Sequence, residues 1–395
     1  MIYEKEERKP QIWLCGGHFI NDIYTGVLNP IMPFIAEQVN ISMAFATFIL
    51  SCSHIFASIF QPFFGYFADK MRKRALIFWG LIFTAVFLSN APTATNPYIM
   101  IVFIVLGSLG SSLYHPQALG LIPKFSTSNV AKNMGIFIAM GTLGFSLGPL
   151  VSSSIAQYLG LDKMPVMCVI GIVWALLMFN FVPKFSTESI TKADSFDFGK
   201  AFSDILKNKK LDILIVISIL KSLMQTSCSM LLPFLWQRMN YSKFEIGLAL
   251  FFFLFSGGVA SFLSPKIEKK IGTKNVFYIS MILPLPIILL FALTYRTIPL
   301  LSFALVALTG FVIMFAVPVM MSMAQKILPQ YKSIIGGFIN GFSWGVVAIM
   351  ITIISKFADH NNCIVPVICV VALIPAICSF MVNKLFPKMP TDFSG

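Results

Sequence analysis

Charged side chains are scarce in this sequence. Only 11% of its 395 residues are Asp, Glu, Lys or Arg, against about 25% in soluble globular proteins, whereas 57% are hydrophobic. Apolar runs of about 18 residues or more recur along the whole chain, and each is long enough to cross roughly 30 Å of hydrocarbon as a helix. The scarcity of charge therefore excludes a soluble globular protein and indicates a multi-pass membrane protein.

Other absences narrow the function. No GxxxxGK[ST] pattern is present, so ATP is not expected to drive the protein. The seven cysteines have neither metal-ligand nor redox spacing and are expected to be buried as small apolar residues. No pair of acids falls within the apolar runs, and the four histidines lie on different runs or in loops. We therefore expect no cofactor, no metal and no enzymatic activity. A membrane-embedded enzyme or a sensor remains as an alternative of another class.

The apolar runs predict an all-α polytopic protein with twelve transmembrane helices. The spans are expected at 11–38, 43–69, 75–92, 97–124, 130–158, 163–183, 212–238, 243–265, 275–294, 299–328, 333–356 and 362–386. The run that follows the charged start is too long for a signal-peptide core, so we expect the first span to be retained.

An internal repeat divides the chain into two halves. The segment IMPFIAEQVNIS at 31–42 aligns with LLPFLWQRMNYS at 231–242, which places Pro33 on Pro233 and Asn40 on Asn240. Because each unit has an even number of spans, the two copies cross the membrane in the same direction. Two pseudo-symmetric six-helix bundles of this kind are the arrangement of the major facilitator superfamily. The expected domains are an N-terminal bundle at 1–183, a cytoplasmic linker at 184–211 and a C-terminal bundle at 212–395.

The distribution of positive charge predicts the orientation. Of the 29 lysines and arginines, 23 fall in the two termini and the loops after even-numbered spans, 5 fall on the opposite side, and Lys221 lies inside a span. The positive-inside rule then places both termini in the cytoplasm. The net charge of +13 follows from this topology and does not call for a nucleic-acid partner.

Two charges are placed deep inside spans. Asp22 is the only acid well inside a span, and His18, Asn21, Thr25 and Asn29 share its helical face. Lys221 is the only base in the middle of a span and aligns with Asn21 in the repeat. Since a charge at the bilayer centre costs about 2.5–3.5 kcal/mol or more, we expect Asp22 and Lys221 to line a central pathway and face one another; a purely structural ion pair is the alternative.

Further polar residues within the spans complete the expected site. Asp22 and His115 are the candidates for proton coupling, since His115 lies beside Pro116 in a span and histidine exchanges protons near neutral pH. Packing against a neighbouring helix is the alternative for His115. The expected substrate-binding residues are His18, Asn21, Thr25, His54, Gln61, Tyr114, Gln117, Lys221, Gln225, Gln325, Asn340 and Trp344.

Two glycine-containing motifs suggest conformational roles. The segment GYFADKMRKR at 65–74 resembles the superfamily's loop signature, and its Gly65, Asp69, Lys73 and Arg74 are expected to latch the cytoplasmic side. The segment GTLGFSLGPL at 141–150 resembles the glycine–proline signature of antiporters. In that signature, small residues form a groove for another helix and proline bends the span. The matching residues in this sequence are Gly141, Gly144, Gly148 and Pro149.

Taken together, HFINDIYTGVLNPIMPFI, QPFFGYFADK, GSSLYHPQALG, SLGPL, LKSLMQ, AQKILPQYKSIIGGFINGFSWG and FADHNN resemble the fosmidomycin resistance protein family from about residue 12 to 386. The resemblance implies a bacterial inner-membrane exporter that works by alternating access and exchanges small organic anions or drugs for protons. We expect a monomer in contact with membrane lipid, whose partners are its small-molecule substrate and protons. A proton symporter that imports a nutrient is the alternative. Lys269, where the second half of the chain would carry the latch acid, departs from the family pattern.

Overall fold

The computed structural model describes residues 2–61, 64, 75–126, 130–183 and 203–386. Within these residues every regular element is a helix. In the N-terminal half the helices are α1 (Ile2–Gly26), α2 (Leu28–Gln38), α3 (Met43–Ile59), α5 (Ala75–Asn90), η1 (Ala91–Thr93), α6 (Pro97–Leu121), η2 (Pro123–Phe125), α7 (Val130–Tyr158), η3 (Leu161–Met167) and α8 (Cys168–Phe181).

The C-terminal half repeats this pattern with more interruptions. Its helices are α10 (Lys209–Arg238), α11 (Lys243–Ile271), α12 (Thr273–Ile282), α13 (Pro284–Thr294), α14 (Pro299–Met314), α15 (Val317–Ile327), η4 (Pro329–Tyr331), α16 (Lys332–Gly336), the π-helix η5 (Gly337–Phe342), α17 (Ser343–His360), α18 (Ile364–Cys378) and α19 (Met381–Leu385). Several breaks coincide with proline, whose ring prevents one backbone hydrogen bond.

These helices confirm the predicted spans. In the described part of the chain, ten helical stretches are long and apolar enough to cross a membrane. The first two predicted spans correspond to α1 with α2, and to α3. The helices extend beyond the predicted ends in places: α1 begins at Ile2, and α11 continues to Ile271. Lys269 and Lys270 lie in the last turn of α11, where positive charge stabilises a helix C-terminus and lets the helix run on past the apolar part.

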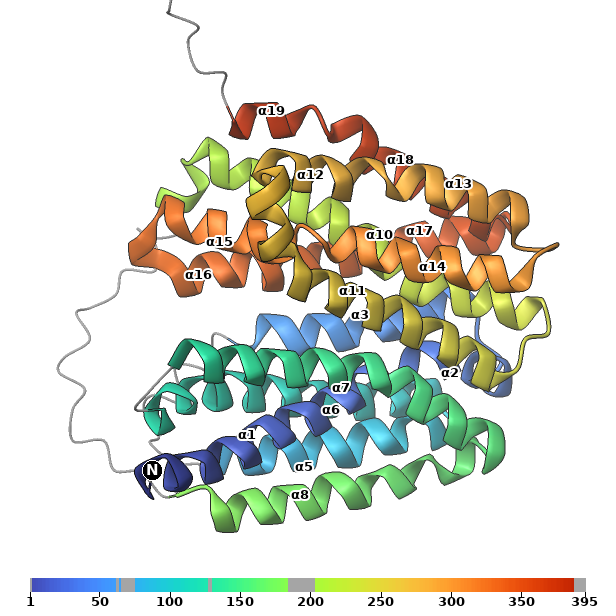
Figure 1. Ribbon diagram of the computed structural model, residues 1–395. Coiled ribbons are helices and arrows are strands. Elements are labelled where there is room, and N and C mark those ends of the chain that lie inside the picture. Colours follow the sequence, from blue (N-terminus) through green and yellow to red (C-terminus); the bar gives the residue numbers. More distant parts are fainter. Residues whose placement is uncertain (1, 62–63, 65–74, 127–129, 184–202, 387–395) are drawn as a thin grey trace, which may run out of the picture.

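The helices form two bundles (Figure 1). In the first, α1 packs against α7 and α8, and α5 against α6 and α8. In the second, α10 packs against α17 and α18, and α11 and α13 pack against α14. Two long seams join the bundles, one between α3 and α17 and one between α7 and α11, with further contacts between α2 and α10.

The repeat inferred from the alignment recurs in the backbone. Asn40 and Asn240 both adopt a left-handed conformation, with φ of 54° and 62°, directly after α2 and α10. Asparagine tolerates this region better than most residues, and it ends a helix there. Two residues later, Ser42 and Ser242 each cap the next helix through the side-chain oxygen. The two halves therefore make the same turn with the same residues.

The turns after Asn40 and Asn240 lie at one end of the molecule, which we call the outer end because the charge distribution predicts that it faces away from the cytoplasm. We call the opposite end the inner end, and the charge distribution predicts a cytoplasmic latch. Its residues Gly65, Asp69, Lys73 and Arg74 lie outside the described residues. The latch therefore stays a prediction.

Candidate functional site

Asp22 lies between two histidines in the N-terminal bundle. His18 is one helical turn earlier on α1, and its Nε2 is 3.2 Å from Asp22 Oδ2. His115 comes from α6, and its Nε2 is 3.0 Å from Asp22 Oδ1. We call His18, Asp22 and His115 the triad. The prediction placed Asp22 and His115 together for proton coupling; the structure adds His18, which had been predicted to bind substrate.

Neutral polar groups hold the triad in position. Asn21 is fully buried, and its Nδ2 donates to Asp22 Oδ1 at 3.0 Å and to Ser111 Oγ at 3.1 Å. His18 Nδ1 lies 2.8 Å from the carbonyl oxygen of Phe137 on α7, whose ring stacks on the imidazole at 4.0 Å between centroids. His115 Nδ1 lies 2.9 Å from the carbonyl oxygen of Ser111. The orientation of both imidazole rings is thus fixed from the side away from Asp22.

The glycines of the glycine–proline motif, on α7, pack directly against α1. A Cβ added at Gly144 would lie 2.1 Å from the carbonyl oxygen of Phe19, and one at Gly148 would lie 2.4 Å from that of Ile23. At Gly141 it would meet the ring of His18 at 2.3 Å and Asp22 Oδ2 at 2.8 Å. These glycines let α7 approach α1 closely, and one of them lies directly against the triad.

The spacing of the triad would also admit a divalent cation, since one ligand atom from each residue lies within 4.8 Å of the others. No metal was expected from the sequence, where the two histidines and the acid are spread over residues 18 to 115. The direct contacts of 3.0 and 3.2 Å are also hydrogen-bond distances. The three side chains can therefore hydrogen-bond one another without any further group.

Lys221 has different surroundings from Asp22. Its side chain is buried, with 3% exposed, and among the described residues its Nζ has no hydrogen-bond partner. It forms no ion pair with Asp22, whose charged contacts are the two histidines. Gln225, one turn further along α10, is also buried. The alternative of a structural ion pair between the two mid-membrane charges is therefore absent from the described contacts, and the central pathway that both were expected to line stays a prediction.

His54 and Trp344 meet across the two bundles. His54 lies on α3 and Trp344 on α17, and their rings stack with centroids 5.2 Å apart and an interplanar angle of 17°. Further along the same seam, Ser51 accepts a hydrogen bond from Thr352 at 3.3 Å. Both rings were predicted to bind substrate from opposite halves, and the structure brings them into contact.

The remaining predicted residues have varied environments. Tyr114 is fully buried and donates to the carbonyl oxygen of Leu14 at 2.9 Å, while the side-chain oxygen of Gln117 accepts from the backbone of Ile77 at 2.8 Å. These contacts favour packing roles. Thr25 donates to the carbonyl oxygen of Asp22 in its own helix, and Gln61, two residues past the end of α3, donates to that of Ala57. Gln325 is half-buried on α15, and the side chain of Asn340, in η5, lies outside the described part.

The outer end is closed by polar contacts between the bundles. Gln237 donates to Glu37 at 2.8 Å, and these residues are 200 positions apart, the offset of the repeat. Equivalent positions therefore meet at the pseudo-twofold axis. Beside them, Arg238 pairs with Asp359 at 3.1 Å.

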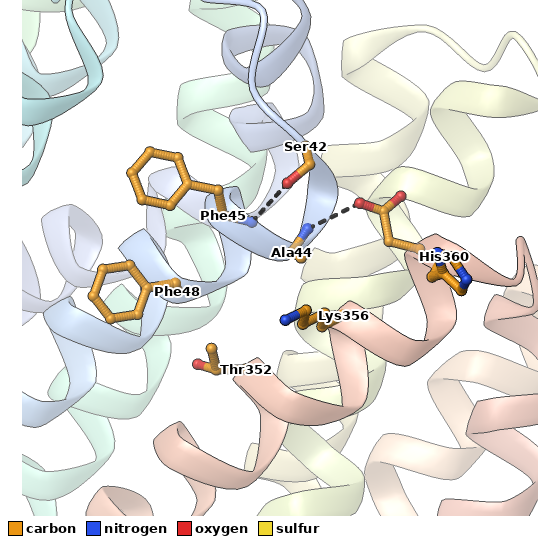
Figure 2. Close-up of a pocket in the computed structure, with 8 residues that line it drawn as sticks. Ser42, Ala44, Phe45, Phe48, Thr352, Lys356 and His360 are labelled. Atoms are coloured by element: carbon orange, nitrogen blue, oxygen red, sulfur yellow. Dashed lines mark hydrogen bonds between the residues drawn. The ribbon is translucent and has the colours of Figure 1, made fainter.

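Helix N-termini take part in the same closure. Asp359 Oδ2, on α17, accepts from the backbone N–H of Ala44 at the start of α3, as Figure 2 shows. On the other seam Gln157, on α7, accepts from the backbone N–H of Lys243 at the start of α11 at 3.1 Å. Each bundle thus caps a helix of the other. Sequence reasoning missed these contacts. The alignment of 31–42 with 231–242 places Glu37 on Gln237, but it did not predict that their side chains would meet.

An open groove of about 630 Å³ lies beside Asp359 at the outer end (Figure 2). Phe45 and Phe48 of α3 line one side, and Thr352, Lys356 and His360 of α17 line the other. The groove contains no triad residue and is far along α17 from Trp344.

Comparison with known proteins establishes the family. The pattern of the Major Facilitator Superfamily matches residues 14–352. The chain belongs to this superfamily. It is 23% identical to the fosmidomycin resistance protein of Escherichia coli over 92% of this chain and 88% of that protein. It is 23% identical to the quinolone resistance protein NorA of Staphylococcus aureus, over 87% and 84%.

Solved transporters share the fold. The nucleoside transporter NupG superimposes with a TM-score of 0.74 at 18% identity, over 96% of this chain and all of that one. A bacterial homologue of the lysosomal transporter Spinster, in an inward-facing and unoccupied conformation, gives 0.74 at 14% identity, over 96% and 98%. The protein is a membrane transporter of small molecules and not an enzyme.

Proposed function

We propose that this transporter exports a small organic anion or drug across a bacterial inner membrane in exchange for protons, with both termini in the cytoplasm. The observation that carries the proposal is Asp22 held between His18 and His115 inside membrane-spanning helices. A carboxylate and two imidazoles are groups that gain and lose protons, and ionisable residues inside a membrane usually mark a transport pathway.

Lys221 supports an anionic substrate. A buried ammonium without a partner is costly, at about 2.5–3.5 kcal/mol or more within a bilayer, and an anionic ligand would satisfy it. Gln225 and Ser222, both buried on the same helix, supply polar groups next to it. The proton site then lies in the N-terminal bundle and the anion site in the C-terminal bundle. Movement of one bundle relative to the other therefore affects both sites.

Export is supported by two relatives. Both are named for resistance to an antibiotic, fosmidomycin in one case and quinolones in the other. In this cycle the closed outer end opens once the anion has bound from the cytoplasm. Protons then enter the triad from outside and return inward as the bundles rock back.

The test uses purified protein in liposomes that contain a pH-sensitive dye. Fosmidomycin, a quinolone and a panel of organic anions are added as probes across an imposed pH gradient. We expect protons and the transported anion to move in opposite directions. Asp22→Asn should abolish proton-driven accumulation. The control Asp162→Asn, an exposed acid paired with its neighbour Lys163 at the outer end, should retain it.

Two results would contradict the proposal. Undiminished gradient-driven transport by Asp22→Asn would remove the triad from coupling. Movement of protons and anion in the same direction would instead support a symporter that imports its substrate.

A further inference from the structure

We infer that the triad holds two exchangeable protons when its three residues are in contact, and that His18 carries one of them. The inference rests on the proposed coupling at Asp22 and deepens it.

In each imidazole of the triad, the ring nitrogen Nδ1 faces away from Asp22. His18 Nδ1 lies 2.8 Å from the backbone oxygen of Phe137, and His115 Nδ1 lies 2.9 Å from that of Ser111. A carbonyl oxygen has no proton to donate, so each Nδ1 carries one when it makes this hydrogen bond. At His115 the Oγ of Ser111 also lies 3.2 Å from Nδ1, and we take this hydroxyl to accept the same proton. A neutral ring with its proton on Nδ1 presents a lone pair at Nε2.

The other ring nitrogen of each imidazole, Nε2, faces Asp22. The two Nε2 atoms lie 3.2 and 3.0 Å from the two carboxylate oxygens. A bare Nε2 and a bare carboxylate oxygen are both acceptors and repel each other at that distance. Each contact therefore requires one proton, on the nitrogen or on the oxygen, and two contacts require two. Asn21 also donates to Asp22 Oδ1, but its hydrogen does not lie between an Nε2 and the carboxylate, so it does not replace either proton.

The proton count sets the charge of the triad. With two protons the three side chains carry a net charge of +1, with one they are neutral, and with none the charge is −1. Emptying the triad breaks both contacts and leaves a carboxylate inside the membrane. Each contact needs its proton only while the two groups touch, so we expect the triad to release both protons in one cycle, when its geometry opens and the three residues separate.

Other titratable groups on the helices around α1 do not replace these contacts. On α6, Tyr114 lies nearest, with its ring 6.4 Å from that of His18, but its hydroxyl donates to Leu14. On α7, the residues against the triad are Phe137 and Gly141, neither of which titrates. The α5 helix carries no titratable residue. Besides the seven at the start of α1, from Tyr3 to Lys9, the others on α1 and the elements packed against it are Cys15, Tyr24, Tyr98, Lys124, Lys132, Tyr158 and Cys168.

The first test measures the protons directly and needs no substrate. The protein contains four histidines, so the ¹⁵N signals of histidine-labelled protein in lipid nanodiscs can be assigned with His18→Gln and His115→Gln. We expect that neither histidine of the triad shows a ring nitrogen with a free lone pair. A free Nε2 lone pair on either residue would overturn the inference, as would a stoichiometric amount of bound zinc or another divalent cation in the purified protein.

The second test measures the ratio of protons to anion transported in liposomes, with fosmidomycin or whichever panel anion is exchanged as the probe. We expect a ratio of two for the natural chain and one for His18→Gln, because the contact between His115 and Asp22 remains. The control His360→Gln, an exposed histidine on α17, should keep the ratio of two. Should His18→Gln fail to fold, His115→Gln tests the same count.

The outcomes separate this inference from the proposed function. A ratio of one in the natural chain, or an unchanged ratio of two in His18→Gln, would overturn the two-proton count and leave proton exchange standing. An absence of coupled proton movement in the natural chain would refute both.

Discussion

The close contact between α1 and α7 gives a prediction in which two similar substitutions have effects of opposite sign. Gly144 and Gly135 both lie on α7. A Cβ at Gly144 would lie 2.1 Å from the backbone oxygen of Phe19, whereas a Cβ at Gly135 has nothing within 4 Å. Backbone atoms cannot rotate away as a side chain can, so α1 and α7 must separate to admit the methyl group of Gly144→Ala.

The expected magnitudes follow from packing and helix propensity. Overpacking a tight contact typically costs about 1–3 kcal/mol, so Gly144→Ala should lower the free energy of unfolding by that amount. Alanine is more favourable than glycine in a helix by about 1 kcal/mol in water, so Gly135→Ala should leave stability unchanged or raise it. Unfolding of the purified protein by sodium dodecyl sulfate, followed by tryptophan fluorescence, measures both changes.

The same substitution should reach the triad. Since α1 carries His18 and Asp22 while His115 lies on α6, displacement of α1 lengthens the contact of 3.0 Å between Asp22 and His115. Proton-coupled transport should therefore fall in Gly144→Ala more than expression does, and Gly135→Ala should retain it. A Gly144→Ala protein as stable and as active as the natural one would refute the reasoning.

Two other predictions concern charge. Asp359→Asn keeps an acceptor for the N-terminus of α3 but loses the ion pair with Arg238, worth up to about 1 kcal/mol at an exposed site, so the outer end should open about fivefold more often. Cysteine labelling at the outer end should rise in Asp359→Asn, whereas in the control Asp162→Asn it should stay unchanged. Equal labelling of the two variants would contradict this prediction. Lys221→Met removes a buried amine without a partner, so it should stabilise the protein without bound substrate by about 1–3 kcal/mol, as measured by denaturant unfolding. The same substitution should weaken anion transport. A destabilised protein would mean that the amine is already paired.

The spans and the repeat could be predicted because their signals are local. The length of an apolar run determines whether it crosses the bilayer, and Asn40 with Asn240 marks the same turn in both halves. The prediction also singled out Asp22 and His115, since polar residues inside a span have few alternative roles.

The partners of these residues could not be predicted, because they depend on packing between distant segments. The sequence shows His18 four residues before Asp22, but only the packing of α1 against α6 brings His115 to the same carboxylate. Likewise, the alignment of Lys221 with Asn21 did not reveal that the amine would be buried without a partner.

The contact between Glu37 and Gln237 has a consequence for how such a chain can arise. In an ancestral homodimer of two identical six-helix subunits, a residue on the symmetry axis would have met its own copy, and two ionised glutamates at 2.8 Å would repel. Once a gene fusion had placed both subunits in one polypeptide, each copy was free to mutate alone. A carboxylate facing an amide at this spot is therefore a pairing that two identical subunits could not have held.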